Sequence, residues 1–282
     1  MSENTYQNAI YLATAIKESN IGLTEELINQ GVDVNYKDPW GETALHNASE
    51  SGNFEIVKLL VDNGADVNAE RRVHRDKDDK YYPLTIAISK GYISIAEFLV
   101  NQGANVNSYD KFHSTPLHFL SRSAHWEYRL TKIDKAGLAV ACKKEEVFFK
   151  LLIKKGVHIC TKNDLGHTPL SEAIGMTNLH IAKLLIEHGI DINVRGRHGQ
   201  TPVFNAYSIE AYQFCIDNGA DLNIHDTYTA TTPLHTAASF RNPKVIELLV
   251  KNGAHINSIQ EDGRTPLQQA IYFGCELNNI QA

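Results

Sequence analysis

Apolar residues recur along this chain in short blocks with the spacing of one helix face, and a glycine closes most blocks. The block at 54–60 (Phe-Glu-Ile-Val-Lys-Leu-Leu) predicts a helix with one buried side. Gly64 follows it and predicts the end of that helix, because glycine readily adopts the left-handed conformation that other residues avoid. The pattern as a whole predicts a series of short helices.

The glycines that close the blocks also begin a polar pattern. Motifs related to Gly-Ala-Asp-Val-Asn occupy 31–35, 64–68, 103–107, 189–193, 219–223 and 253–257, and a degenerate copy ending in cysteine occupies 156–160. The intervals between successive glycines are 33, 39, 53, 33, 30 and 34 residues. They describe a repeat of 33 residues with two insertions and one small deletion.

A second motif keeps step with the glycines and predicts where helices begin. Its copies vary around Thr-Pro-Leu-His and occupy 43–46, 82–85, 115–118, 168–171, 201–204, 232–235 and 265–268. The threonine hydroxyl can cap backbone N–H groups, and proline suits the first helical position, where no amide hydrogen is needed. The leucine then begins the buried side of the helix.

This period and these two motifs together resemble the ankyrin repeat. The resemblance covers nearly the whole chain in seven to eight copies. It implies an all-α solenoid whose repeats each contain a β-turn finger and two antiparallel helices, stabilised mainly by neighbouring repeats. The predicted repeats span 6–37 (a cap), 38–70, 71–109, 110–162, 163–195, 196–225, 226–259 and a truncated 260–282.

Two repeats are enlarged. The insert at 71–80 has five basic and three acidic residues and either extends into solvent as a fingertip or serves as a docking loop, with Tyr81 and Tyr82 at its base. The insert at about 122–137 contains Trp126 and Tyr128. It either packs back onto the repeats or binds a partner, because long loops in compact domains are seldom idle.

The resemblance implies that fingertips and the exposed side of each first helix line a concave face. The register places one row of side chains at the tips: Trp40, Phe112, Leu165, His198 and Tyr228, with Asp262 at the end. The neighbouring polar rim would be Glu42, Lys111, Ser114, His167, Arg197 and Gln200. Each ring could instead fold onto the adjacent finger, but a whole row of anchors favours binding.

Composition narrows the choice of partner. The chain has 43% hydrophobic and 21% charged residues, as folded proteins do, and its formal net charge of -6 favours a basic protein over nucleic acid. No apolar run reaches the roughly 18–20 residues that span a bilayer, and the first residues do not resemble a signal peptide. Four widely separated cysteines indicate free thiols in a reducing compartment, so we expect a cytoplasmic protein without membrane contact.

The residues that could carry chemistry have structural interpretations. The resemblance implies that the motif histidines His46, His118 and His235 bond between finger backbones. The Asp or Asn in the middle of most glycine motifs belongs to a turn that satisfies its own backbone. His180 and His188 lie too far apart along one helix to share a metal ion, and Cys142 and Cys215 belong to apolar helix patterns. No metal site, cofactor or enzymatic activity is therefore expected.

The sequence thus predicts a non-enzymatic module that binds another protein through the concave face and the enlarged fingers. An inhibitor or immunity protein and a pathogen effector, which would act in the host cytoplasm, are two versions of this function. The alternative is an ankyrin receptor for nucleotides or other small ligands. It would need basic and aromatic groups to converge, and the nearest approach is Arg195, Arg197 and Phe204.

Overall fold

The computed structural model describes residues 3–72, 80–131, 135–240 and 242–273. The chain divides into two compact parts, Met1–His158 (the N-terminal part) and Ile159–Ala282 (the C-terminal part). Within the described residues the regular structure is helical apart from one short pair of strands. The all-α class is therefore confirmed, whereas the individual repeat boundaries remain a prediction.

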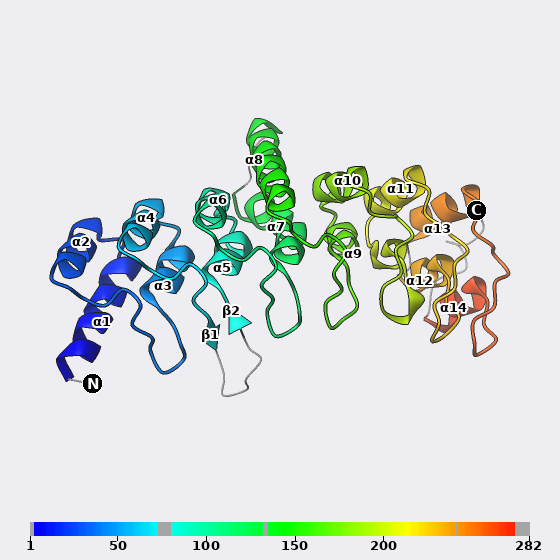
Figure 1. Ribbon diagram of the computed structural model, residues 1–282. Helices are drawn as coiled ribbons and strands as arrows, with labels where there is room; N and C mark the ends of the chain where they lie inside the picture. The colour runs from blue at the N-terminus through cyan, green and yellow to red at the C-terminus, as the bar shows by residue number, and fades with distance from the viewer. Residues whose placement is uncertain (1–2, 73–79, 132–134, 241, 274–282) are drawn as a thin grey trace. The chain divides into compact units, whose positions relative to one another are not determined.

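The N-terminal part contains four helix pairs. Their bounds are α1 Glu3–Lys17, α2 Ile21–Asn29, α3 Ala44–Ser51, α4 Phe54–Asp62, α5 Pro83–Ser89, α6 Ile93–Asn101, α7 Pro116–Thr131 and α8 Lys135–Lys154. The first helices of the pairs pack on one another, as do the second helices, so the part has two helical layers (Figure 1). Loops extend from the first layer as fingers. Leu45, Leu60, Leu84, Leu99 and Phe149 are fully buried between the layers.

The C-terminal part repeats the arrangement with one shortened repeat. Its elements are α9 Pro169–Gly175, α10 Leu179–Glu187, η1 Arg197–Gly199, η2 Pro202–Asn205, α11 Ile209–Asp217, α12 Pro233–Ser239, α13 Pro243–Lys251 and α14 Pro266–Tyr272. The single turn of 3-10 helix η2 stands where the other repeats have a first helix, because only six residues separate Thr201 from the N-cap Ser208 of α11. The repeat with the 30-residue interval has therefore lost one turn of helix.

The predicted helix starts and stops are confirmed. Thr168, Thr232 and Thr265 each accept a hydrogen bond at their side chain from the backbone N–H three residues later. A proline follows each of them as the first helical residue. Gly64 has φ +83°, the left-handed value that its sequence position requires.

The last asparagine of five glycine motifs joins successive repeats. The Asn68 side chain donates to the Gly103 carbonyl (3.1 Å) and accepts from the Asn105 N–H (2.7 Å), so it holds the next loop at two points. The same pair of bonds is made by Asn35 and Asn107 in the N-terminal part and by Asn193 and Asn223 in the C-terminal part. The middle residue caps its own turn, as predicted: Asp66 Oδ1 accepts from the Asn68 N–H at 2.9 Å.

Cys160 occupies the position of this asparagine in the degenerate motif, and its side chain is exposed. Thiols are weak hydrogen-bonding groups. We therefore expect Cys160→Asn to add the two bonds, to the Gly189 carbonyl and the Asp191 N–H, and to raise the free energy of unfolding by about 1–2 kcal/mol. Urea unfolding of the wild type, Cys160→Asn and Cys160→Ala measures this. An asparagine variant no more stable than the alanine variant would contradict the expected bonds.

The two inserts take different structures. The first, at 71–80, contains the short strand β1 (Arg71–Arg72) and the first residue of β2 (Lys80–Tyr81), and these antiparallel strands pair Arg71 with Tyr81; residues 73–79 lie outside the described residues. The second lies largely within lengthened helices. α7 has 16 residues and α8 has 20, against 8 in α3 and 9 in α4. The expected excursion is thus mainly helical.

Candidate functional site

The fingertips of the N-terminal part expose the predicted rings. Trp40 is 58% exposed and Phe112 is 50% exposed. An aspartate holds each finger: Asp38 Oδ1 accepts from the N–H groups of Trp40 (2.9 Å) and Glu42 (2.8 Å). Asp110 Oδ1 accepts in the same way from Phe112 (2.9 Å). Each ring therefore stands on a fixed turn without being buried by the neighbouring finger.

The fingertips of the C-terminal part are joined to one another. The Arg197 N–H donates to the Gly166 carbonyl (3.3 Å), and the Thr227 N–H donates to the His198 carbonyl (2.6 Å). A third bond runs from the Glu261 N–H to the Thr229 carbonyl (2.8 Å). Successive fingers are therefore held in register by their backbones.

Three of the predicted tip side chains stand on these joined fingers. Leu165 is 54% exposed and Tyr228 is 71% exposed. The His198 and Tyr228 rings are in contact, with centroids 5.2 Å apart. At this pair a ring does pack against the adjacent finger, which was the alternative to partner binding. The contact leaves most of Tyr228 open to solvent. The tyrosine can therefore be both supported by its neighbour and presented outward.

The predicted polar rim is only partly at the surface. Arg197 is exposed, and Lys111 lies 5.1 Å from the centre of the Phe112 ring. Glu42 is half-buried and forms an ion pair with Arg71 at 3.1 Å. Ser114, however, is only 1% exposed, and its hydroxyl accepts from the Arg122 guanidinium at 2.7 Å. Ser114 therefore belongs to the scaffold, and the prediction that it forms part of the binding surface at the fingertips is wrong.

The residues at the base of the first insert are half-buried. The Tyr82 hydroxyl donates to Glu70 at 3.4 Å, and the Tyr81 carbonyl faces His46 Nε2 at 3.3 Å. These contacts tie both tyrosines to the neighbouring repeat. Trp126 and Tyr128 lie in α7, but their side chains lie outside the described residues.

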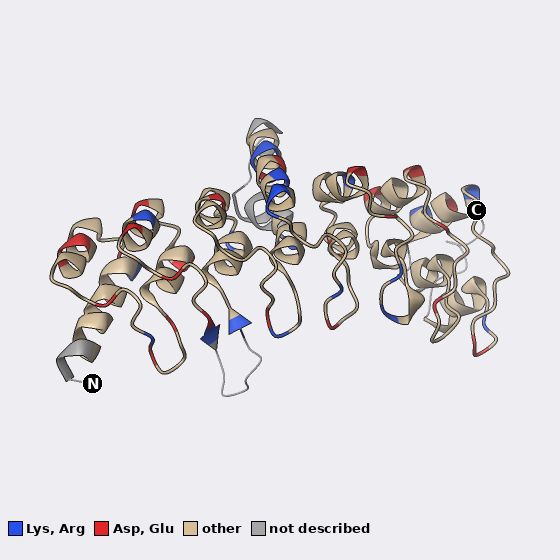
Figure 2. Ribbon diagram, in the orientation of Figure 1, with Lys and Arg blue, Asp and Glu red and all other residues tan. Residues whose placement is uncertain are grey.

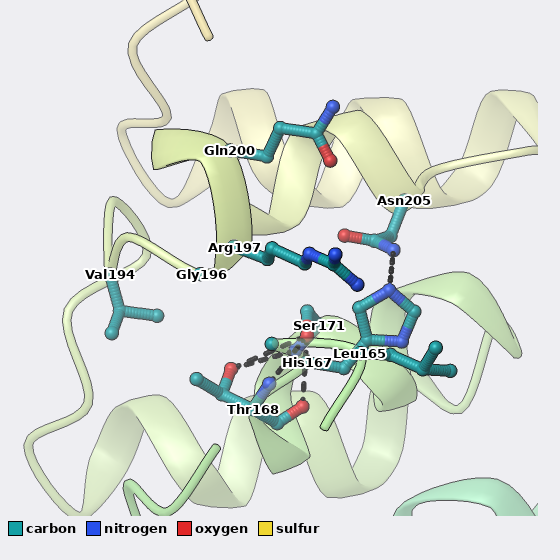
Figure 3. A pocket seen from close by; sticks show the side chains of 10 residues that line it. Leu165, His167, Thr168, Ser171, Val194, Gly196, Arg197, Gln200 and Asn205 are labelled. Carbon is teal, nitrogen blue, oxygen red and sulfur yellow. Dashed lines mark hydrogen bonds between the residues drawn. The ribbon is translucent and has the colours of Figure 1, made fainter. Parts of the chain in front are cut away.

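Gln200 and His167 line a small polar pocket in the C-terminal part (Figure 3). His167 Nδ1 lies 3.3 Å from the buried Glu172 carboxylate, and its Nε2 lies 3.4 Å from Asn205 Nδ2. Arg197 lines the same pocket (Figure 3). The free space is about 10 Å³, which is room for about one water molecule.

The residues suggested for a nucleotide do not converge there. Phe204 is 6% exposed and belongs to the core, so it cannot stack on a base. Arg195 and Arg197 are exposed, but the pocket beside Arg197 is far smaller than a nucleotide. At Arg195, Arg197 and Phe204 the small-ligand alternative therefore has neither an exposed ring nor a cavity large enough for a nucleotide.

His46 and His235 have the role that the resemblance implied, since each ring reaches a backbone carbonyl of the next finger. In the motifs of His46, His118 and His235, the ring Nδ1 lies 2.8–2.9 Å from the motif threonine hydroxyl. His235 Nε2 reaches the Arg264 carbonyl of the next finger at 3.1 Å. Burial lowers the pKa of His46 to about 4 and also lowers that of His235. Both rings are neutral structural links at pH 7.

The thiols of Cys142 and Cys215 are less acidic than an ordinary cysteine thiol, because each has a raised pKa. Burial raises the pKa of the Cys215 thiol to about 12, and burial with the Glu145 charge raises that of Cys142. Low thiol acidity disfavours a nucleophilic role. In the part of the chain that the structure describes, no three His, Cys, Asp or Glu side chains are grouped so that they could hold a metal ion.

One exposed aromatic of the fingers was missed by the row of tip positions. Tyr109 is 44% exposed, its ring stacks on His113 with centroids 4.8 Å apart, and Lys80 Nζ lies 5.6 Å from its centre. Tyr109 directly precedes the finger aspartate Asp110, and its place beside that aspartate is the sequence signal that could have identified it. Tyr109 and Phe112 thus belong to one fingertip cluster.

Comparisons with known proteins agree with this architecture. The family described as ankyrin repeats in three copies matches residues 2–71, 129–196 and 203–280, and ankyrin repeats in many copies match 48–100. The variola virus ankyrin repeat protein OPG189 is 24% identical over 282 residues, which is 96% of this chain and 45% of that protein. The putative ankyrin repeat protein YahD of Escherichia coli is 25% identical over 69% of this chain and 87% of its own length.

The chain therefore spans less than half of its viral relative. None of the described helices has the length and apolar character needed to cross a membrane. Ankyrin repeats indicate a protein–protein interaction module, and proteins built from them are in general scaffolds for interaction rather than enzymes. The family models match most of the length of the chain, and the repeat motifs form the hydrogen bonds described above. This chain therefore belongs to the ankyrin-repeat family.

Proposed function

We propose that this chain is a non-enzymatic module that holds a partner protein through its fingertips. The observation that carries the proposal is the exposure of large apolar side chains at one finger position in several repeats. Trp40, Phe112, Leu165 and Tyr228 are each half or more exposed although they stand on well-ordered turns. Rigid aromatic side chains bury much area for little loss of rotamer freedom, so they are effective interface anchors.

The backbone bonds of the fingers support this function. Binding loses free energy when loops must become ordered, and preformed turns reduce that cost. Asp38 and Asp110 cap the turns under Trp40 and Phe112, and the linked fingers support Tyr228. Polar groups beside the rings, such as Arg197 and Lys111, would form the rim of the interface.

The net charge suggests the chemistry of the partner. A formal charge of -6 favours association with a basic protein. An inhibitor or immunity protein that covers a basic enzyme would use this charge, and so would an effector that occupies a host protein in the host cytoplasm. The viral relative, itself an ankyrin repeat protein, is compatible with the effector version.

We expect the combined variant Trp40→Ala, Phe112→Ala, Tyr228→Ala to lose at least tenfold in partner binding, because each change removes an exposed anchor. Pull-down from source-cell lysate, followed by titration of the captured protein, measures this. Tyr207→Ala is the matched control: Tyr207 is 60% exposed but lies between η2 and α11, outside the fingers. Circular dichroism establishes that all variants are folded.

Equal retention by the fingertip variant and the wild type would contradict the proposed surface. Stronger loss with Tyr207→Ala would move the interface away from the fingers. A rise in melting temperature with nucleotides would favour the small-ligand receptor instead, since a ligand that binds only the folded state stabilises it.

A further inference from the structure

Helix α8 presents a basic surface with an apolar centre to the solvent. The lengthened helix carries exposed Val140 and Val147, which are 57% and 51% exposed, and half-buried Leu151. These three residues are seven and four positions apart, so they form one line along the helix. Val140 and Val147 are more than half exposed, so the packing of the helix does not account for apolar side chains at these positions.

Lysines flank this line on both sides. By helical register Lys143, Lys150 and Lys154 lie along one side of the line, and Lys144 and Lys155 lie along the other. All five are exposed. We call the eight residues Val140, Lys143, Lys144, Val147, Lys150, Leu151, Lys154 and Lys155 the α8 stripe.

The opposite side of α8 anchors the helix, so the stripe stands on a fixed support. Phe148, Phe149 and Leu152 are fully buried, and α8 packs on α6 and α7. Glu145 also points inward and accepts from the Ser123 hydroxyl at 3.4 Å. The acidic groups beside the stripe are therefore few: Glu146, which pairs with Lys150, and Glu97 of α6.

The stripe contrasts with the charge of the whole chain. The protein has a formal charge of -6, yet Figure 2 shows Lys and Arg concentrated along α8. A shallow hollow of about 290 Å³ lies between Glu97, Val140, Lys143, Lys144 and Val147. It has an apolar floor and a mainly basic rim.

We propose that the α8 stripe docks an acidic amphipathic helix of a partner protein. Apolar side chains of that helix would cover Val140 and Val147, and its Asp and Glu side chains would meet the lysines on both sides. This is helix-against-helix recognition with complementary charge. This surface lies on the layer of second helices, whereas the surface proposed above lies at the fingertips. The proposal for the stripe does not depend on the proposal for the fingertips.

Other anionic surfaces fit the stripe less well. Nucleic acid would satisfy the lysines but not cover the valines, and the stripe has no arginine or aromatic side chain for base contacts. A membrane-binding helix places bulky Trp, Phe or Leu side chains in the bilayer interface, whereas this stripe has two valines and one half-buried leucine. An acidic protein helix matches both the charge and the small apolar centre.

Selection of peptides tests the proposal. A displayed library of random peptides of about 16 residues, long enough to follow the stripe at 1.5 Å per residue, is selected on the wild-type chain. Binders are then counted on two variants, Val140→Ser with Val147→Ser and Lys143→Gln with Lys144→Gln. The expected result is a class of acidic peptides with helically spaced apolar residues whose affinity falls at least tenfold in each variant.

Matched controls separate charge from position. Lys58→Gln with Lys183→Gln removes two exposed lysines of α4 and α10, and it should leave the affinity of the selected peptides within twofold. All substitutions lie at exposed positions, so folding should persist, and circular dichroism checks this. Because the interaction is partly electrostatic, affinity should also fall as the salt concentration rises.

Three outcomes would overturn the proposal. The first is that no peptide class distinguishes the wild type from both stripe variants. The second is that the selected peptides are not acidic. The third is that phosphatidylserine vesicles or a DNA duplex bind the wild type more tightly than the peptides do and lose that binding in the lysine variant. Loss of fingertip binding alone would leave every stripe result unchanged, so the two proposals can fail separately.

Discussion

Lowering the pH from 7 to 4 is expected to reduce the free energy of unfolding by about 3 kcal/mol through His46 alone. His46 is fully buried, and burial lowers its pKa to about 4; the charges of Arg71 and Lys37 act in the same direction, and the bond to the Tyr81 carbonyl opposes them. In the unfolded chain the ring titrates at about 6.5.

The direction follows from proton uptake. Between pH 6.5 and 4 the unfolded chain binds a proton at His46 and the folded chain does not, so stability rises with pH in this window. The contribution is complete above the unfolded pKa and is lost as the pH falls toward 4. His235, whose pKa is also lowered by burial, adds a loss in the same direction.

His46→Gln isolates the effect. Gln268 occupies the same motif position in the last repeat, and its Oε1 accepts from the Thr265 N–H at 2.9 Å, so glutamine can replace the cap. We expect the variant to be less stable at pH 7 but to lose about 3 kcal/mol less between pH 7 and 4 than the wild type. Urea unfolding at several pH values measures this. Parallel pH profiles for the two proteins would show that His46 does not carry the acid sensitivity.

Gly166→Ala is expected to destabilise the C-terminal part by about 3 kcal/mol, from the left-handed backbone conformation and a steric clash together. Gly166 has φ +74°, which costs a residue with a side chain roughly 1–2 kcal/mol. An added Cβ would lie 2.5 Å from the Arg197 backbone nitrogen and closer still to the Arg197 Cβ. The next finger would have to move away, and the Arg197–Gly166 backbone bond would break.

Gly263→Ala is the matched control. Gly263 occupies the same finger position with φ +83°, and nothing lies within 4 Å of its added Cβ. It should therefore lose only the conformational part, about 1–2 kcal/mol. Thermal and urea unfolding of both variants give the difference. Equal losses would mean that the fingers at Gly166 and Arg197 are not closely packed.

The candidate surface could be predicted in part. The row of tip positions came from the register of the repeats, and the structure places Trp40, Phe112, Leu165 and Tyr228 at exposed tips. The rim was harder, because exposure depends on what lies across from a residue. Ser114 is a small polar residue, a type that is mostly exposed. It is nevertheless buried, and its hydroxyl accepts a hydrogen bond from Arg122, eight residues later in the chain.

The α8 stripe illustrates the same limit. The stripe begins at Val140, just after the insert expected at about 122–137, and the sequence does not say whether that insert forms a loop or lengthens the helices beside it. Only a continuous helix brings Val140, Val147 and Leu151 into one line, so the role that we propose for the stripe depends on where this helix runs. The tertiary contacts of Phe148, Phe149 and Leu152 then decide which side of that helix faces the solvent.

The sequence by itself determined the family and most of the places where helices begin and end. These features depend on local chemistry: a threonine cap, a proline at the first helical position and a glycine with positive φ act within a few residues. The tertiary structure alone decided how repeats are joined, through Asn68 and its counterparts, and which polar residues reach the surface. Those outcomes rest on contacts between residues about one repeat apart, whose geometry exists only after the repeats have stacked.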